Sequence, residues 1–262
     1  MRGWGTPRIP GPPQGTLSSM IQNRRAVRYN HAEAIAHLKA VDAKLGALIE
    51  RVGDYSLGVK STHSPFEALL ESIIYQQLHG KAAAAILARL LETFGDMHPS
   101  PELILRVPEA QLRGVGLSGA KTAAILDLAA KTVDGTVPDI ARIRRMSDEE
   151  ITTRLIQVRG VGTWTAEMFL MFRLGRPDVM PVTDFGVRRG FALTFQKLKP
   201  QTKLTPDLLA KPEQILRRAE KWRPWRSVAS WYLWRACDLA NKDLAAHREA
   251  EKLKEKKRKA KK

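Results

Sequence analysis

Two glycines that flank a single valine have the type and spacing that most clearly indicate a chemical role. They lie in Gln157-Val-Arg-Gly-Val-Gly-Thr-Trp-Thr-Ala166. Gly160 and Gly162 can adopt backbone angles that other residues resist, so they predict a tight turn between two helices. Such a turn directs main-chain amides outward at the start of the next helix, where they suit a phosphate oxygen. An ordinary helix connection has the same pattern, and both interpretations stay open at this point.

A second candidate is Asp184, which precedes Phe185-Gly-Val-Arg-Arg189 and by spacing alone predicts a helix N-cap. Four tryptophans gather between positions 222 and 234, where core packing is the ordinary role for most of them. The six histidines and Cys237 show no spacing typical of a transition-metal site. A single cysteine also excludes an internal disulfide and a four-cysteine iron–sulfur cluster, and it fits a reducing cytoplasm.

The charge balance favours a polyanionic partner. The 262 residues carry a formal net charge of +17, which indicates nucleic acid rather than a membrane surface. The charge is concentrated at the ends, with +5 in residues 1–30 and +6 in residues 242–262. No stretch reaches the roughly 18 apolar residues of a membrane helix, and the Pro/Gly-rich start differs from a secretory signal. We therefore expect a cytoplasmic protein without a membrane partner.

The apolar pattern predicts an all-α fold without strands. Residues 1–30 show no period and are predicted to be disordered, whereas apolar residues recur at spacings of three and four from about position 31. Ser64-Pro65 predicts a helix start, with a break at His79-Gly80 and a second helix up to Phe94. Further helices are predicted at 101–106, 108–113, 119–132, 147–157, 163–174, 184–197, 206–210, 212–222 and 224–240. Residues 242–262 should continue the last helix as a frayed basic tail.

Four motifs follow one another along residues 33–241. The stretch Ile156–Phe169 holds the glycine turn, and Gly175-Arg-Pro177 leads into Met180-Pro-Val-Thr-Asp184. Tyr75-Gln-Gln-Leu78 and the tryptophan-rich Trp222–Trp234 are the other two. Together they resemble the helix–hairpin–helix DNA glycosylase superfamily, and within it the alkylation-repair branch of the 3-methyladenine DNA glycosylase II type. The resemblance implies a glycosylase domain at 31–241, with two helical subdomains flanking a cleft and no N-terminal β domain.

The resemblance implies that Asp184 is the catalytic carboxylate. Breaking the bond from the sugar C1′ to a base leaves positive charge on the sugar, which a nearby carboxylate stabilises. Many relatives carry a second aspartate just before this one, whereas Thr183 stands here. Lyase-type relatives place a lysine in the hairpin to form a Schiff base, and Trp164 occupies that position. We therefore expect a monofunctional glycosylase.

The family pattern also assigns the groups that would hold an extruded base and the duplex. The base pocket is expected at Trp164, Trp234, Met168, Gln76, Phe66 and Tyr75. Gln77 is expected to fill the gap left in the duplex, with Leu78 as the alternative if the register shifts by one. Contacts to the DNA backbone are expected at Arg159, Gly160, Gly162, Thr165 and Lys81. Core packing is the alternative role for the aromatic residues.

The hairpin of the family often holds a monovalent cation through main-chain carbonyls. The carbonyls of Ile156, Val158 and Val161 would supply the oxygens for Na⁺ or K⁺, and no other cofactor or iron–sulfur cluster is expected. Lys121 lies in a looser hairpin-like segment, and we expect it to be solvated or to face a phosphate rather than to act as a nucleophile.

The leading interpretation is a monomeric DNA glycosylase that removes alkylated bases from double-stranded DNA in base excision repair. A glycosylase for oxidised or mismatched bases is one alternative. A non-catalytic, structure-specific DNA-binding protein is the other, and Asp184 together with the aromatic pocket residues disfavours it.

Overall fold

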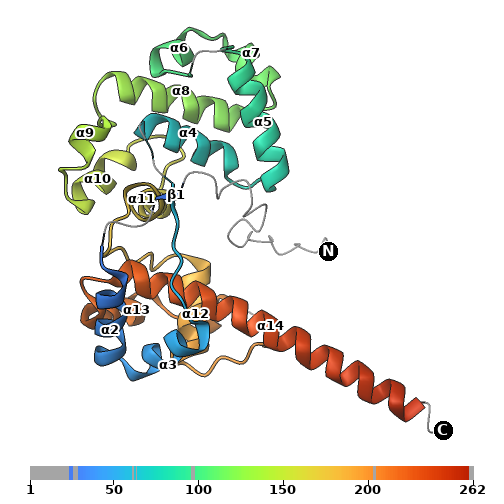
Figure 1. Cartoon of the computed structure of the whole chain (residues 1–262). Helices are drawn as coiled ribbons and strands as arrows, with labels where there is room; N and C mark the ends of the chain where they lie inside the picture. The colour runs from blue at the N-terminus through green and yellow to red at the C-terminus, as the bar shows by residue number, and fades with distance from the viewer. Residues whose placement is uncertain are drawn as a thin grey trace. The chain divides into compact units, whose positions relative to one another are not determined.

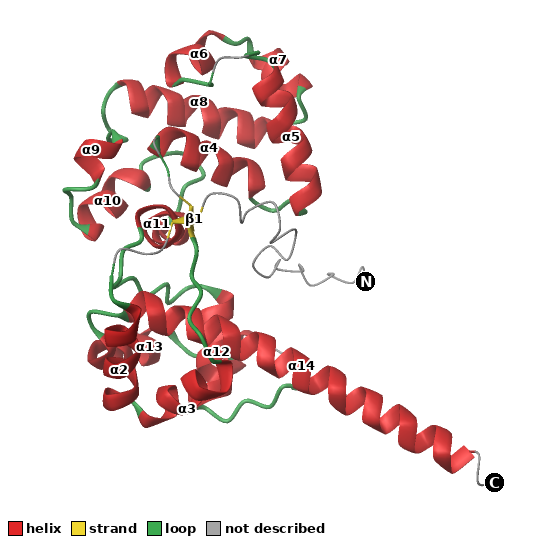
Figure 2. Cartoon of the chain, in the orientation of Figure 1, coloured by secondary structure: helices red, strands yellow, loops and turns green. Residues whose placement is uncertain are grey.

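The computed structural model describes residues 24–25, 29–60, 62, 64–95, 98–202 and 205–259, and most of them are helical (Figures 1 and 2). The chain divides into two compact units. Within the described residues, the first comprises Gly58–Arg176 with Arg24–Arg25, and the second comprises residues 29–57 with residues 177–259. The all-α prediction is confirmed, and the two units correspond to the two helical subdomains that were expected. The cleft between them stays a prediction.

The first unit is built around α8. Its helices are α4 (Pro65–Tyr75), α5 (Gly80–Glu92), α6 (Pro101–Arg106), α7 (Glu109–Gly114), α8 (Gly119–Val133), α9 (Ile140–Ile143), α10 (Asp148–Leu155) and α11 (Thr163–Phe169), which continues as the π-helix η2 (Leu170–Leu174). α8 packs against α4 and α6, and Figure 1 shows α4 and α8 side by side. Serine side chains cap four of these helices, at Ser64, Ser100, Ser118 and Ser147. Each cap satisfies an amide that the helix itself leaves unbonded.

The second unit combines the N-terminal helices with the C-terminal part of the chain. It contains α2 (His31–Val41), α3 (Ala43–Val52), α12 (Phe185–Phe195), η3 (Pro206–Leu208), α13 (Pro212–Ala219), η4 (Glu220–Trp222) and α14 (Arg226–Lys259). The closest packing is between α12 and α14, because a Cβ on Gly190 would lie 2.0 Å from the main-chain oxygen of Leu233. Trp222 and Tyr232 are fully buried in the core of this unit.

Two predictions about the segment 1–30 need correction. Arg24–Arg25 pairs as the short strand β1 with β2 (Val59–Lys60), although the sequence predicted disorder and no strand there. Tyr29 also lies in the segment predicted to be disordered, yet its hydroxyl is 2.8 Å from that of Tyr55. The last helix, predicted over 224–240 with a continuation into the basic tail, does continue through the charged residues after 240, as α14 to Lys259. Residues 1–23, 26–28 and 260–262 lie outside the described residues.

The helix boundaries otherwise agree with the sequence to within a few residues. α4 ends at Tyr75, a few residues before the predicted break at His79-Gly80. The helices predicted at 163–174, 206–210 and 212–222 each contain a π or 3-10 turn. Across the parts of the chain that the structure describes, no helix has the length and apolar character needed to cross a membrane.

Candidate active site

Asp184 begins α12 as its N-cap. Its Oδ1 atom accepts a hydrogen bond of 2.8 Å from the main-chain amide of Val187 and one of 2.7 Å from Nε1 of Trp234. The N-cap predicted by spacing alone is therefore confirmed. The two donors come from different helices and fix the orientation of the carboxylate, which is only half-buried. A fixed, partly accessible carboxylate of this kind can serve in catalysis as well as in capping.

Trp234 packs against the first turn of α12 at Gly186, which has no side chain. A Cβ on Gly186 would be 2.6 Å from Cδ1 of Trp234, so only glycine leaves room for the indole here. The tryptophan is 7% exposed. Most of its surface is thus used in packing and in holding Asp184, and its expected role in stacking a base stays a prediction.

Cys237 lies next to this contact on α14. Its thiol donates to the main-chain oxygen of Gly186 over 3.4 Å, and burial raises its pKa to about 11. A thiol with so high a pKa is neutral at physiological pH, and it therefore makes a poor nucleophile.

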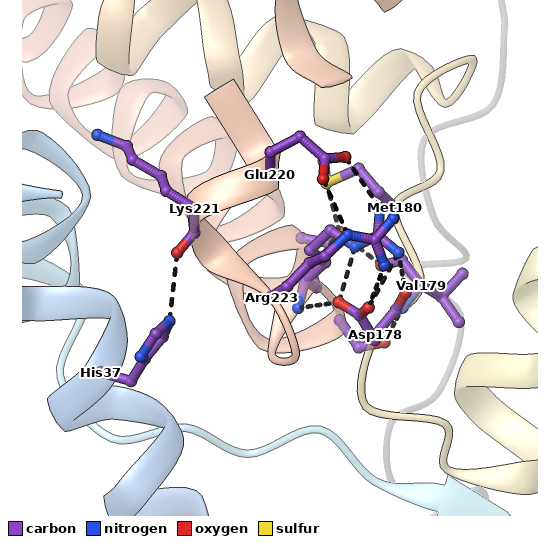
Figure 3. A network of polar contacts seen from close by, with 10 residues as sticks. His37, Asp178, Val179, Met180, Glu220, Lys221 and Arg223 are labelled. Atoms are coloured by element: carbon purple, nitrogen blue, oxygen red, sulfur yellow. Dashed lines mark hydrogen bonds and ion pairs between the residues drawn. The ribbon is translucent and has the colours of Figure 1, made fainter. Parts of the chain in front are cut away.

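The loop that leads into Asp184 is anchored to the start of α14 (Figure 3). Asp178 accepts hydrogen bonds of 2.7 Å from Nη1 of Arg223 and 2.7 Å from Nε of Arg226. The amide of Val179 donates to the buried hydroxyl of Ser227 over 3.0 Å. Because charge-assisted bonds to a carboxylate are the strong ones, this network fixes the loop several residues ahead of Asp184.

The glycine turn of the first unit is a tight hairpin between α10 and α11. Gly160 adopts a φ of 77°, which favours glycine, and Gly162 is the N-cap of α11. Val158 and Val161 are buried and anchor the turn, whereas Arg159, Gly160 and Gly162 are exposed. The amide of Val161 donates to the carbonyl of Val158 over 3.0 Å. The exposed residues of this hairpin are those predicted to meet the DNA backbone.

The turn between α4 and α5 carries the predicted wedge. Gln77 is exposed and has a φ of 55°, a conformation that glutamine rarely adopts. Gln76 does not extend into open space, since its Nε2 atom donates to the carbonyl of Gly160 over 2.9 Å. The assignment of Gln76 to the base pocket is therefore weakened. The exposed Lys81 lies in the first turn of α5, as expected for a phosphate contact.

The expectation that Lys121 is solvated needs correction. Its ammonium group donates to the main-chain carbonyls of Ile74 and Gln76, the latter over 2.7 Å, and the residue is half-buried. Carbonyls at the end of a helix lack partners within the helix, and a cation satisfies them well. Burial lowers the pKa of this lysine.

The predicted pocket residues differ in exposure. Trp164 is 45% exposed at the start of α11, and Met168 and Tyr75 are half-buried. Phe66 is 2% exposed within the core of the first unit, which agrees with core packing, the alternative role, and its pocket role stays a prediction. Thr165 is buried as well, and this burial disfavours the expected contact with a phosphate.

Several contacts around these segments had no signal in the sequence. Lys121 and Asp127 of α8, and Asp178 with its two arginines, act across long stretches of chain. Gly186 and Gly190 did carry a usable signal, because two small residues four apart allow close helix packing. Among the described residues, no three His, Cys, Asp or Glu side chains cluster in a way that could hold a metal ion.

The hairpin of the first unit and the capping aspartate of the second unit both fall within the region matched by a family of DNA repair proteins. The family described as HhH-GPD superfamily base excision DNA repair protein matches residues 70–214, and the chain belongs to this family. The resemblance expected from the four motifs is therefore confirmed.

Relatives within this family act on alkylated DNA according to their names. DNA-3-methyladenine glycosylase 1 of Schizosaccharomyces pombe is 32% identical, over 84% of this chain and 94% of that protein. A structure of the 3-methyladenine DNA glycosylase of the same yeast in complex with abasic DNA covers 77% of this chain and 95% of its own, with a TM-score of 0.65 and 33% identity. DNA-3-methyladenine glycosidase of Bacillus halodurans gives a TM-score of 0.68 and 29% identity, over 82% of this chain and 92% of its own.

Proposed function

We propose that this protein is a monofunctional DNA glycosylase that hydrolyses the N-glycosidic bond of alkylated bases in double-stranded DNA. The observation that carries the proposal is the Asp184 carboxylate, held at the start of α12 by the Val187 amide and the Trp234 indole. The names of the relatives, 3-methyladenine DNA glycosylases, support the substrate class and the place in base excision repair.

The chemistry requires a carboxylate close to C1′ of the sugar. As the base departs, positive charge develops on the deoxyribose, and a fixed negative group stabilises it without reorganisation. Asp184 would supply this group and orient the attacking water. An alkylated purine that carries positive charge leaves as a neutral base, so its bond is already weakened. A lysine nucleophile is not needed, and Trp164 stands where the lyases carry one.

Recognition would divide between stacking and gap filling. Trp164 offers an exposed indole at the start of α11, and a cation over an indole face gains ~0.5–2 kcal/mol. Trp234, Met168 and Tyr75 would add further walls. Gln77, exposed at a strained turn, would occupy the space that the extruded base leaves in the duplex.

The hairpin would bind the DNA backbone through Arg159, Gly160 and Gly162, with Lys81 at a further phosphate. A monovalent cation would be held by the main-chain carbonyls of Ile156, Val158 and Val161 and would add positive charge beside the phosphate. The turn fits this role, because hard cations prefer oxygen ligands and the Val158 carbonyl keeps a second lone pair beside its bond to Val161. We further propose that the protein acts as a monomer in the cytoplasm, with the DNA.

Asp184→Asn tests the proposal directly. The wild type should release methylated purines from alkylated duplex DNA, whereas the variant should release none yet bind abasic DNA as tightly as the wild type. The asparagine Oδ1 can still accept the Val187 amide, so the N-cap and the fold are kept. A wild type that binds duplex DNA but releases no modified base would favour the non-catalytic binding protein instead.

A further inference from the structure

One face of α8 contacts both turns that the proposed function places on DNA. Lys121, Ala124 and Asp127 are spaced by three along this helix and therefore lie on one side of it. Lys121 bonds the carbonyls at the end of α4, before the turn that carries Gln77. A Cβ placed on Gly160 would lie 3.4 Å from the Cβ of Ala124.

Asp127 holds the hairpin from the same face. Its Oδ2 atom accepts a hydrogen bond of 2.6 Å from the main-chain amide of Arg159. Both of its oxygens also accept from Nζ of Lys131, over 2.8 and 2.7 Å. The lysine fixes the carboxylate in the position that the Arg159 amide needs. The side chain of Arg159 meanwhile stays exposed for a phosphate.

The two turns are joined to each other as well as to α8. The side-chain amide of Gln76 donates to the main-chain carbonyl of Gly160, and the main-chain carbonyl of Gln76 accepts from Lys121. Gln77 follows directly with its positive φ of 55°. A non-glycine residue keeps such a conformation only where the surrounding contacts over-determine it. The bonds to Lys121 and Gly160 are contacts of this kind.

We propose that α8 is a positioning element in which Lys121 sets the wedge turn and Asp127 sets the hairpin. The inference rests on the proposed function, in which Gln77 fills the duplex and the hairpin holds a phosphate. Neither residue touches the reacting atoms. Together they keep the gap-filling side chain at a fixed distance from the hairpin's contact with the DNA backbone. When the hairpin binds its phosphate, Gln77 is therefore already placed to fill the gap left by the extruded base.

Lys121→Met separates positioning from general damage. Single-turnover excision is measured on a duplex with the alkylated base paired and on one where it lies in a single-nucleotide bulge. The variant should be about tenfold slower on the paired base, because small misplacements of a positioned group cost that much. On the bulged base, which is already unstacked, it should come within about twofold of the wild type. Lys121→Arg, which keeps donors for both carbonyls, should recover most of the rate.

Lys44→Met, which removes one charge from the exposed surface of α3, is the matched control and should excise both bases normally. An equal loss on both duplexes, or a wild-type rate for Lys121→Met on the paired base, would overturn the role of Lys121. A 2-aminopurine placed beside an abasic site reports unstacking without chemistry. If the wild type releases no base, the proposed function fails, but the 2-aminopurine fluorescence still tests this inference. A smaller fluorescence increase with Lys121→Met than with the wild type would support it, and an equal increase would overturn it.

Asp127→Ala tests the hairpin through DNA affinity rather than through the excision rate. Loss of the acceptor for the Arg159 amide should raise the Kd for undamaged duplex about tenfold, the size expected when one hydrogen bond to a charged group is removed. Asp127→Asn keeps an acceptor oxygen and should bind more tightly than Asp127→Ala. Wild-type affinity in both variants would remove Asp127 from the positioning role.

Discussion

At the scale of single residues, the site depends on groups that orient other groups. Asp184 is oriented by the Val187 amide and by the Trp234 indole, and the indole reaches it only because position 186 is glycine. The sequence placed Asp184 correctly at a helix start, since capping is a local property. It assigned Trp234 to the pocket, with core packing as the alternative, and it missed the bond to Asp184, which spans 50 residues and leaves no local pattern.

Trp234→Phe should distinguish the two roles of this tryptophan. Phenylalanine keeps an aromatic ring but lacks the donor to Asp184, so the carboxylate loses the orienting bond from the indole. We expect kcat to fall about tenfold with little change in KM, because a positioning bond acts on the chemical step. Steady-state kinetics on methylated duplex DNA measure this. Trp231→Phe, on the same helix, is the matched control. A rise in KM with unchanged kcat would instead assign Trp234 to base binding.

At the scale of elements, the helices were predictable and the contacts that join them were not. Serine caps and apolar periods are local, and they located α4, α6, α8 and α10 to within a few residues. The bonds that join elements connect residues far apart in the chain, 45 positions for Lys121 with Gln76 and 48 positions for Asp178 with Arg226. No periodic pattern encodes such pairs, and for this reason Lys121 was predicted to be solvated.

Asp42 joins the helices of the second unit and gives their stability a defined pH dependence. It lies between α2 and α3, 2% exposed, and accepts bonds from Arg218 and Trp222. Burial raises the pKa of its carboxyl, but the bonds from Arg218, Trp222 and Lys221 outweigh burial and lower the pKa to about 2. Because the folded pKa is below the unfolded value, the stabilisation is complete above about pH 4 and is lost as the pH falls toward 2.

This part of the stability should amount to about 2 kcal/mol. Urea unfolding of the wild type between pH 5 and pH 2, followed by tryptophan fluorescence, should therefore show a decline that Asp42→Asn largely lacks. The variant should also be less stable than the wild type at pH 7, because the half-buried guanidinium of Arg218 loses its charged partner. Asp207→Asn, an exposed carboxyl in η3, is the control. The same acid slope in Asp42→Asn as in the wild type would show that other carboxyls determine it.

At the scale of the whole molecule, the order of the chain differs from the order of its units. Residues 28–57 pack with the C-terminal part, and the hydroxyl of Tyr232 donates to the carbonyl of Gly53 over 3.1 Å. The sequence predicted one continuous domain at 31–241 with two subdomains, but it contained no signal for which segments belong to each. Composition did indicate a polyanionic partner, because net charge is a property of the whole chain.

The basic C-terminal segment 242–262 should increase DNA affinity without choosing the base. Its net charge of +6 lies beyond the packed part of α14, where the described side chains up to Lys252 are almost all exposed. Deleting it should weaken duplex binding and flatten the dependence of log K on log salt, by about 0.9 for each phosphate that the segment neutralises. Fluorescence anisotropy across a salt series measures both effects.

Replacing the lysines and arginines of this segment by glutamine keeps its length, and should reproduce the deletion if charge is responsible. Because the lesion is recognised elsewhere, the ratio of rates on different alkylated bases should not change, and a shift in that ratio would place part of the recognition in this helix.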